Sequence, residues 1–180
     1  MIKRLLFIIC FAASAFSFSQ EFHSGEIIKD YGKIYSVENP SFKTDTTATY
    51  KVVFDVGRSF DNPSQPNALI ETAARFINMH REAGVPVDNI QVALVIHGAA
   101  STEILKDEFY NEKFPQINTN PNSELISQLA DQGVQIILCG QTAAHRKITK
   151  NKAHPDVQLS LSAMTALIQL QNDGYRLINF

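Results

Sequence analysis

The sequence predicts an α/β fold of three layers, in which an open and mostly parallel sheet has helices on both faces. The first observation is that short apolar segments alternate with helical segments, because this order produces right-handed crossovers between parallel strands. The second is that residues 92–96, Val-Ala-Leu-Val-Ile, are apolar at every position. A strand with two apolar faces must be covered on both of them, as in a parallel sheet between helices.

The first expected strand is residues 51–56, which are short, mostly apolar and rich in β-branched side chains. The helix after it should begin at Asn67, a residue type that caps helices well, and should end at Gly84 and Pro86. Its apolar residues recur at the helical period, and they are Leu69, Ala73, Phe76 and Ile77.

The strand at 92–96 should be followed by a helix that begins at Ser101 or Thr102. A third helix should be capped by Ser123 and should end at Gly133. The remaining expected elements are a buried strand at 134–138, a short helix at 142–148, a brief strand around Val157 and Leu159, a helix at 163–172 and a last strand at 175–180.

Residues 1–19 have the order of a secretory signal peptide. Two basic residues come first, an apolar run covers residues 5–16, and the small residues Ser17 and Ser19 precede a cut before Gln20. A buried N-terminal helix and a lipoprotein signal are the alternatives, but the run lacks helical periodicity and has no cysteine at the cut. The sequence therefore predicts a periplasmic or secreted protein.

The rest of the chain divides into a short arm and one domain. Residues 20–49 are polar and are expected to form an N-terminal arm, with one short hairpin around Ile27 and Ile34-Tyr35. Residues 50–180 contain the alternating pattern and should form a single α/β domain, because 180 residues is the length of one domain.

The composition narrows the classes of function. The net charge is −2, and it becomes −4 without the two basic residues of the signal peptide, so nothing indicates a nucleic-acid partner. No stretch reaches the ~20 apolar residues of a membrane span, so no membrane association is expected after cleavage. Two cysteines are too few for a disulfide framework or a Cys-rich zinc site.

Several common motifs are absent from the sequence. It contains no G-x-G-x-x-G, no G-x-x-x-x-G-K-[ST] and no G-x-S-x-G. The five histidines do not have the spacing of helical zinc ligands. No cofactor and no metal are therefore expected, although a site built in space from His97, His145 or His154 stays open as an alternative.

Polar and reactive residues follow three of the expected strands. They are Asp55 and Arg58 after the first strand, His97 and Gly98 after the second, and Cys139, Gly140, Gln141 and Thr142 after the third. Ligands of parallel sheets bind beyond the carboxyl ends of the strands. A cysteine that precedes a helix also faces unpaired N–H groups, which stabilise a thiolate.

We therefore interpret Cys139 and His97 as candidate catalytic residues, and the other six as candidate ligand-binding residues. The alternative for Cys139 is a small buried side chain that ends a strand. The alternative for His97 is a loop histidine that is hydrogen-bonded within the protein. We expect Cys139 to be at least partly accessible, with a thiol pKa below the ordinary value, because it lies between a buried strand and the start of a helix.

Four segments give the chain a resemblance to a known family. They are Tyr50-Lys51-Val52-Val53-Phe54-Asp55, Val95-Ile96-His97-Gly98-Ala99-Ala100, the segment from Gly133 to Thr142 (GVQIILCGQT) and Leu170-Gln171-Asn172-Asp173-Gly174-Tyr175. Over residues 50–180 the chain resembles the DsrE/DsrF-like family of small α/β sulfur-relay proteins, in particular its YchN-type branch. The resemblance implies a homotrimer or homohexamer, and a persulfide-carrying cysteine at the position of Cys139.

Two functions are therefore expected as alternatives. In the first, an exported protein handles sulfane sulfur or thiols through Cys139, with His97 supporting the thiolate and an unknown protein or small molecule as sulfur donor or acceptor. In the second, an oligomeric module binds a small molecule or anion without catalysis, and the cysteine is structural. Self-association is expected in both, because the helix at 163–172 is apolar nearly all round.

Overall fold

The computed structural model describes residues 21–179, so the predicted signal peptide at 1–19 lies outside the described residues. Its main sheet has five strands in the order β6-β5-β4-β3-β7, and every neighbouring pair is parallel. The strands are β3 (Tyr50–Val56), β4 (Ile90–Ile96), β5 (Gln135–Cys139), β6 (Val157–Ser160) and β7 (Arg176–Ile178). The predicted parallel sheet is confirmed.

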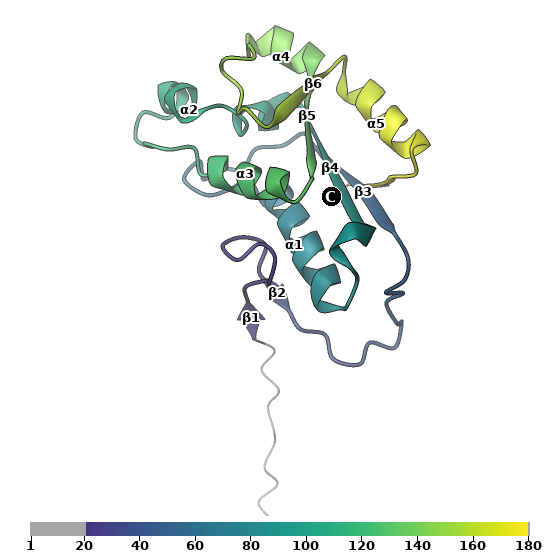
Figure 1. Ribbon diagram of the computed structural model, residues 1–180. Coiled ribbons are helices and arrows are strands. Elements are labelled where there is room, and N and C mark those ends of the chain that lie inside the picture. The colour runs from purple at the N-terminus through teal and green to yellow at the C-terminus, as the bar shows by residue number, and fades with distance from the viewer. Residues whose placement is uncertain (1–20, 180) are drawn as a thin grey trace, which may run out of the picture.

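Helices cover both faces of this sheet, as Figure 1 shows. The α-helices are α1 (Ala68–Glu82), α2 (Asp107–Lys113), α3 (Ser123–Asp131), α4 (Gly140–Arg146) and α5 (Ala163–Asn172). Two 3₁₀-helices, η1 (Val87–Asn89) and η2 (Gly98–Thr102), lie in the connections before and after β4. Helices α1 and α3 pack on one face and α5 packs on the other, which confirms the predicted three layers.

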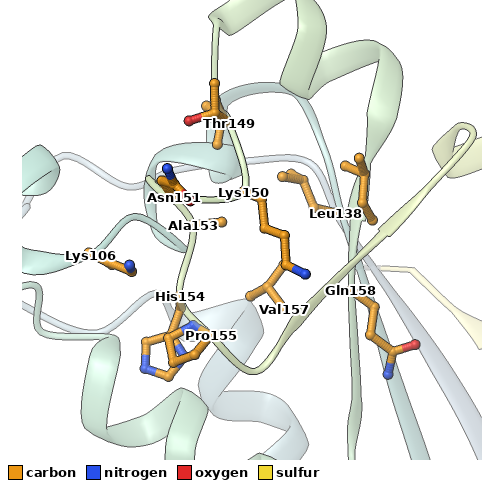
Figure 2. A pocket seen from close by; sticks show the side chains of 12 residues that line it. Lys106, Leu138, Thr149, Lys150, Asn151, Ala153, His154, Pro155, Val157 and Gln158 are labelled. Carbon is orange, nitrogen blue, oxygen red and sulfur yellow. The ribbon is translucent and has the colours of Figure 1, made fainter.

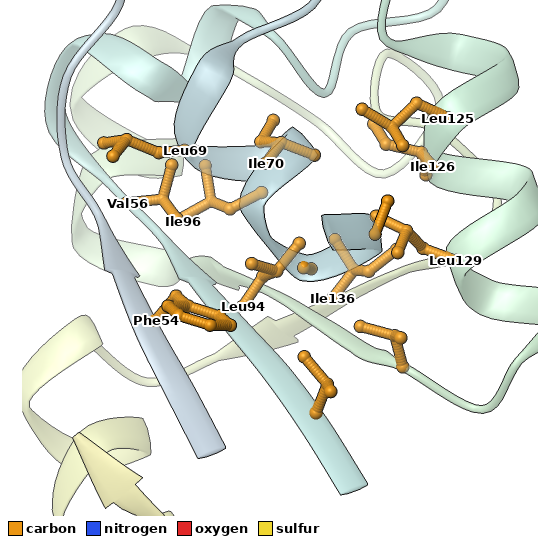
Figure 3. Packing of buried hydrophobic residues seen from close by; sticks show 14 of the residues in the cluster. Phe54, Val56, Leu69, Ile70, Leu94, Ile96, Leu125, Ile126, Leu129 and Ile136 are labelled. Atoms are coloured by element: carbon orange, nitrogen blue, oxygen red, sulfur yellow. The ribbon is translucent and has the colours of Figure 1, made fainter. Parts of the chain in front are cut away.

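The larger core lies between the sheet and the two helices α1 and α3, and Figure 3 shows its packing. The sheet contributes Phe54 and Leu94, and the helices contribute Ile70 and Leu129, all of them buried. Alternate residues of the same strands point to the other face and form the second core with α5. Both faces of β4 are therefore buried, as the apolar run at 92–96 predicted.

The first and last helices begin where a side chain caps them. The Asn67 side chain accepts a hydrogen bond from the Leu69 N–H, so the predicted start of α1 is confirmed. The Ser162 side chain accepts a hydrogen bond from the Thr165 N–H and starts α5 in the same way.

The prediction for the helix after β4 was wrong. Ser101 and Thr102 do not cap an α-helix but lie inside η2, and α2 begins only at Asp107. The reason is local, because the Ser101 hydroxyl donates a hydrogen bond back to the Gly98 carbonyl and is fully buried. This hydrogen bond closes the turn from Gly98 to Ser101 and favours the 3₁₀ conformation over the start of an α-helix there.

The N-terminal arm pairs differently from the prediction. Strand β1 (Phe22–His23) is antiparallel to β2 (Ile34–Tyr35), so the hairpin does not start at Ile27. The intervening loop instead runs along α1, where Ile28 enters the core. The buried Asn78 amide holds it there, since it bonds both the N–H and the carbonyl of Ile28.

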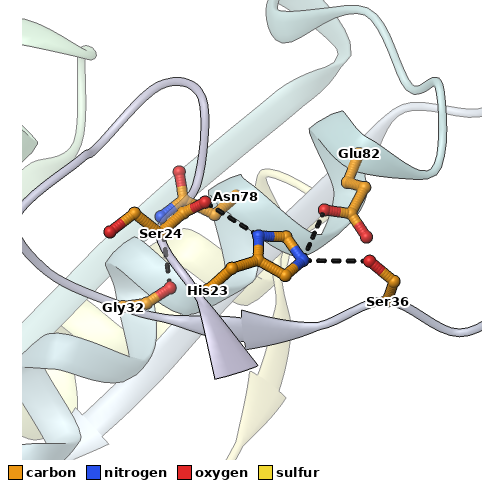
Figure 4. A network of polar contacts seen from close by, with 6 residues as sticks. All are labelled: His23, Ser24, Gly32, Ser36, Asn78 and Glu82. Carbon is orange, nitrogen blue, oxygen red and sulfur yellow. Dashed lines mark hydrogen bonds and ion pairs between the residues drawn. The ribbon is translucent and has the colours of Figure 1, made fainter. Parts of the chain in front are cut away.

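Figure 4 shows two further contacts between the arm and α1, made by Asn78 and Glu82. Asn78 also donates to the Gly32 carbonyl, and His23 lies 3.3 Å from Glu82 at the end of α1. The Gly25 backbone passes so close to Asn78 that a side chain there would overlap the amide. Among residues 21–179, the helices are all too short or too polar to cross a bilayer.

Candidate functional site

Three adjacent strands place their last polar side chains on one face of the sheet. Val53, Val95 and Ile137 belong to the core under α5, and side chains two positions further along a strand point to the same side. Asp55, His97 and Cys139 stand at those positions at the carboxyl edge of the sheet. The parallel register, with Asp55 opposite Val95 and Ile96 opposite Leu138, keeps these strand ends together.

Asp55 and His97 form a direct pair at this edge. The Nε2 atom of His97 lies 2.8 Å from Oδ1 of Asp55, and both side chains are partly exposed. The imidazole lies over Gly57, where a Cβ atom would come within 2.7 Å of Cε1 of the ring. The glycine after β3 therefore makes room for the ring to reach the carboxylate of the neighbouring strand.

Cys139 is the last residue of β5 and the residue before α4. Burial raises the pKa of its thiol, but hydrogen bonds from the backbone and side chain of Thr142 and from the backbone N–H groups of Ala163 and Gln141 lower it. The net pKa of Cys139 is below the ordinary value of 9.0. Within residues 21–179 no cation is among the groups that shift it, so neutral donors stabilise the thiolate.

The direction of this pKa shift agrees with the prediction, whereas the accessibility does not. Only 5% of Cys139 is exposed in the single chain, so the expectation of a partly accessible thiol was wrong. The physical reason is the start of α5, which lies against the end of β5 because β6 pairs with β5 and leads directly into that helix.

Gly140 permits this close approach between α4 and the segment before α5. A Cβ atom at Gly140 would lie 2.3 Å from the Ser160 carbonyl oxygen and 3.0 Å from that of Leu161. Gln141 lies beside it, and its side chain donates a hydrogen bond of 3.3 Å to the Leu161 carbonyl. Gly140 and Gln141 thus hold the surroundings of Cys139 together, and both are residues that the sequence had selected.

Thr142 connects the cysteine to the loop that carries the histidine. Its Oγ1 atom accepts a hydrogen bond of 3.2 Å from the Gly98 N–H, and Thr142 is also among the groups that lower the pKa of Cys139. Gly98 has a φ of +54°, a conformation that favours glycine, and it lies against the Gly57 carbonyl. His97 is therefore linked to Cys139 through Gly98 and Thr142, while its ring bonds Asp55.

Arg58 follows Gly57 in the connection after β3. It lies in the exposed loop after β3, where its guanidinium carbon is 6.0 Å from the centre of the Phe60 ring. Its backbone carbonyl accepts a hydrogen bond from the Asn67 side chain at the start of α1. Among residues 21–179 no group of three or more His, Cys, Asp or Glu side chains could hold a metal ion.

The connections after β5 and β6 leave the sheet toward opposite faces. Ala143 of α4 packs in the core on the α1 side, and Ala166 of α5 packs in the core on the other side. Parallel sheets bind ligands at such a divergence, outside the carboxyl ends of the strands. Cys139 lies at this point, between the end of β5 and the start of α4. The fold and site are those of a parallel α/β protein with a stabilised thiol at the sheet's carboxyl edge.

The chain belongs to the DsrE/DsrF-like family, whose sequence pattern matches residues 51–180. Membership in this family suggests a role related to sulfur relay. A comparison with curated proteins found no match.

Two solved structures share the fold. One is a protein of unknown function, MTH1491 from Methanobacterium thermoautotrophicum, with 18% identity and a TM-score of 0.55. The other is the ychN protein from E. coli, with 17% identity and a TM-score of 0.52. Each alignment covers 73% of this chain and 99% of the other chain. At these low sequence identities, the similarity to the two structures shows the fold alone.

Ala163 at the start of α5 was not predicted from the sequence, although its backbone helps to lower the pKa of Cys139. It also missed Ser160, whose hydroxyl donates to the Leu138 and Ser162 carbonyls and ties β6 to the end of β5. The sequence could have indicated that a helix starts close to the end of this strand, because Ser162 is a residue type that caps helices and it stands two positions after β6.

Proposed function

We propose that this protein accepts sulfane sulfur on Cys139 and passes it on. The observation that carries the proposal is the set of donors around the thiol. Cys139 is the last residue of β5 and precedes the first turn of α4, and nearby groups of Thr142, Ala163 and Gln141 hold the pKa of its thiol below the ordinary value although burial raises it. The thiolate is the nucleophilic form of cysteine, so a lower pKa increases the reactive fraction at neutral pH.

The proposed reaction is an exchange at sulfur. The Cys139 thiolate attacks the outer sulfur of a persulfide donor, R–S–SH, and a new S–S bond forms as the donor's S–S bond breaks. The electron pair of the broken bond leaves with the donor as the thiolate R–S⁻. Cys139 becomes a persulfide, and no external oxidant or reductant is required.

The persulfide would meet the same donors as the thiolate. Its terminal sulfur is negatively charged when deprotonated, and convergent N–H groups stabilise such an anion in a water-poor site. His97 would support the site through the neighbouring Gly98, whose N–H donates to Oγ1 of Thr142, a residue that lowers the pKa of Cys139. The Asp55 carboxylate fixes the His97 ring and hence the loop.

Burial limits the donor to a small species in the single chain. With Cys139 only 5% exposed, a compact donor such as inorganic polysulfide is favoured over a folded protein partner. The experiment is to treat the native protein with inorganic polysulfide and measure its intact mass. A gain of one sulfur atom, located on the Cys139 peptide and absent in Cys139→Ser, is expected.

The same burial favours one alternative function. In a non-catalytic binding module, Cys139 would be a small side chain at the end of a strand, and the surrounding N–H groups would serve packing only. An unmodified Cys139 after polysulfide treatment of the native protein, with modification after unfolding, would favour this alternative and contradict the sulfur-handling proposal.

We further propose that the protein works after export and as a homo-oligomer. Residues 1–19 carry the signal-peptide pattern. The outward side of α5 and the loop before it expose Leu161 (71%), Met164 (72%) and Ile168 (59%). Adjacent exposed apolar side chains of this size mark an interaction surface. Covering them with a second copy would also enclose the start of α5 beside Cys139.

A further inference from the structure

A cavity lies on the face of the sheet opposite to Cys139. It has a volume of about 570 Å³, and most of the residues that line it belong to the connection from α4 to β6 and to β6 itself (Figure 2). Its apolar wall comes from Leu138, Ile148 and Val157. Leu138 belongs to the core on the α1 side, so the strand β5 separates this cavity from the candidate thiol site.

Two lysines give the cavity its charge. Lys106 lies across the cavity from Leu138, and Lys150 extends over it toward Val157 (Figure 2). None of the residues that line this cavity carries a carboxylate. The chain as a whole carries a net negative charge, whereas the lysines give the lining of this cavity a positive charge.

The nearby acidic groups are already engaged outside the cavity. Asp107 accepts hydrogen bonds from the Asn120 N–H and the Ser123 hydroxyl. Asp156 lies 3.5 Å from Nδ1 of His154, a lining residue. Both carboxylates act electrostatically on His154, but neither lines the cavity, whose charged lining side chains are Lys106 and Lys150.

We propose that this cavity binds a small organic carboxylate with an aliphatic body. The two lysines would pair with the carboxylate, and the wall of Leu138, Ile148 and Val157 would cover the hydrocarbon. The volume falls in the range of ordinary small-molecule sites, which combine an apolar lining with a few placed polar groups. This site is independent of the proposed sulfur chemistry, because Cys139 faces the other side of the sheet.

The test is a calorimetric titration of the full mature protein with octanoate as the probe. Acetate lacks the aliphatic body and octan-1-ol lacks the charge, so both should bind at least about tenfold more weakly than octanoate. Lys150→Gln and Lys106→Gln should each weaken octanoate binding about tenfold. Lys147→Gln removes the same charge from a nearby exposed position that does not line the cavity, and it should leave binding unchanged.

A second measurement locates the ligand without any variant. Amide chemical shifts of the labelled native protein should change on octanoate addition around residues 148–159, and Cys139→Ser should bind octanoate as the native protein does. The proposal is overturned if octanoate does not saturate, if octan-1-ol binds equally well, or if Lys147→Gln weakens binding as much as Lys150→Gln. Shift changes confined to another part of the chain would overturn it as well.

Discussion

The hydroxyl of Thr142 should have a measurable effect on the ionisation of Cys139. Thr142 is among the groups that lower the pKa of the thiol, and its oxygen accepts a hydrogen bond of 3.2 Å from the Gly98 N–H. In Thr142→Val the shape is kept and the donor is lost. A hydrogen bond to a charged group contributes about 1.5–3 kcal/mol. Since one pKa unit corresponds to about 1.4 kcal/mol, the pKa of Cys139 should rise by about one to two units.

The assay is the ultraviolet absorbance of the thiolate as a function of pH, which needs no reagent to reach the buried sulfur. Cys139→Ser provides the blank. Thr142→Ser keeps the hydroxyl and is the matched control, so its thiol pKa should stay close to that of the native protein. A Thr142→Val protein that remains folded and titrates like the native protein would refute the argument that this hydroxyl stabilises the thiolate.

Three further predictions concern stability and assembly. Asn78→Ala should lower the free energy of unfolding by about 1–3 kcal/mol, because it leaves the buried N–H of Ile28 without its partner. Chemical denaturation measures this, and an unchanged denaturation midpoint would contradict it. The double variant Met164→Gln, Ile168→Gln should have the mass of one chain in light scattering, because it removes two exposed apolar side chains of the proposed interface. A native protein that is already monomeric would contradict the proposed homo-oligomer. The pKa of Cys139 is lower in the folded state than its ordinary 9.0, so ionisation of the thiol should increase the free energy of unfolding as pH rises from the folded pKa to about 9, and should add nothing at lower pH. Cys139→Ser should lack this increase. Parallel profiles of unfolding free energy against pH in the two proteins would argue against it.

Most of the fold could be predicted from local patterns. The all-apolar run at 92–96 requires cover on both faces, and β4 is indeed buried between α1 and α5. Asn67 and the helical period after it predict α1 closely. The start of α2 was missed because the Ser101 hydroxyl bonds the backbone of its own turn, a choice that depends on the burial of that turn.

The candidate site could be predicted only in part, because its parts come from distant segments. The sequence selected Cys139, Gly140, Gln141 and Thr142 as a strand end before a helix, and their contacts around the sulfur follow from that position. The N–H of Ala163 reaches the thiol only because β6 pairs with β5, which is a non-local event. The same pairing buries Cys139, so its low exposure could not be foreseen from neighbouring residues.

The native fold should activate Cys139 toward sulfane sulfur. The most direct test compares the rate of persulfide formation on Cys139 with inorganic polysulfide at neutral pH, in the native protein and in the chain unfolded by urea. If the donors around the thiol activate it, the native protein reacts faster than the unfolded chain, and Thr142→Val loses much of that advantage. If Cys139 reacts only after unfolding, the thiol is structural and the sulfur-handling account is contradicted.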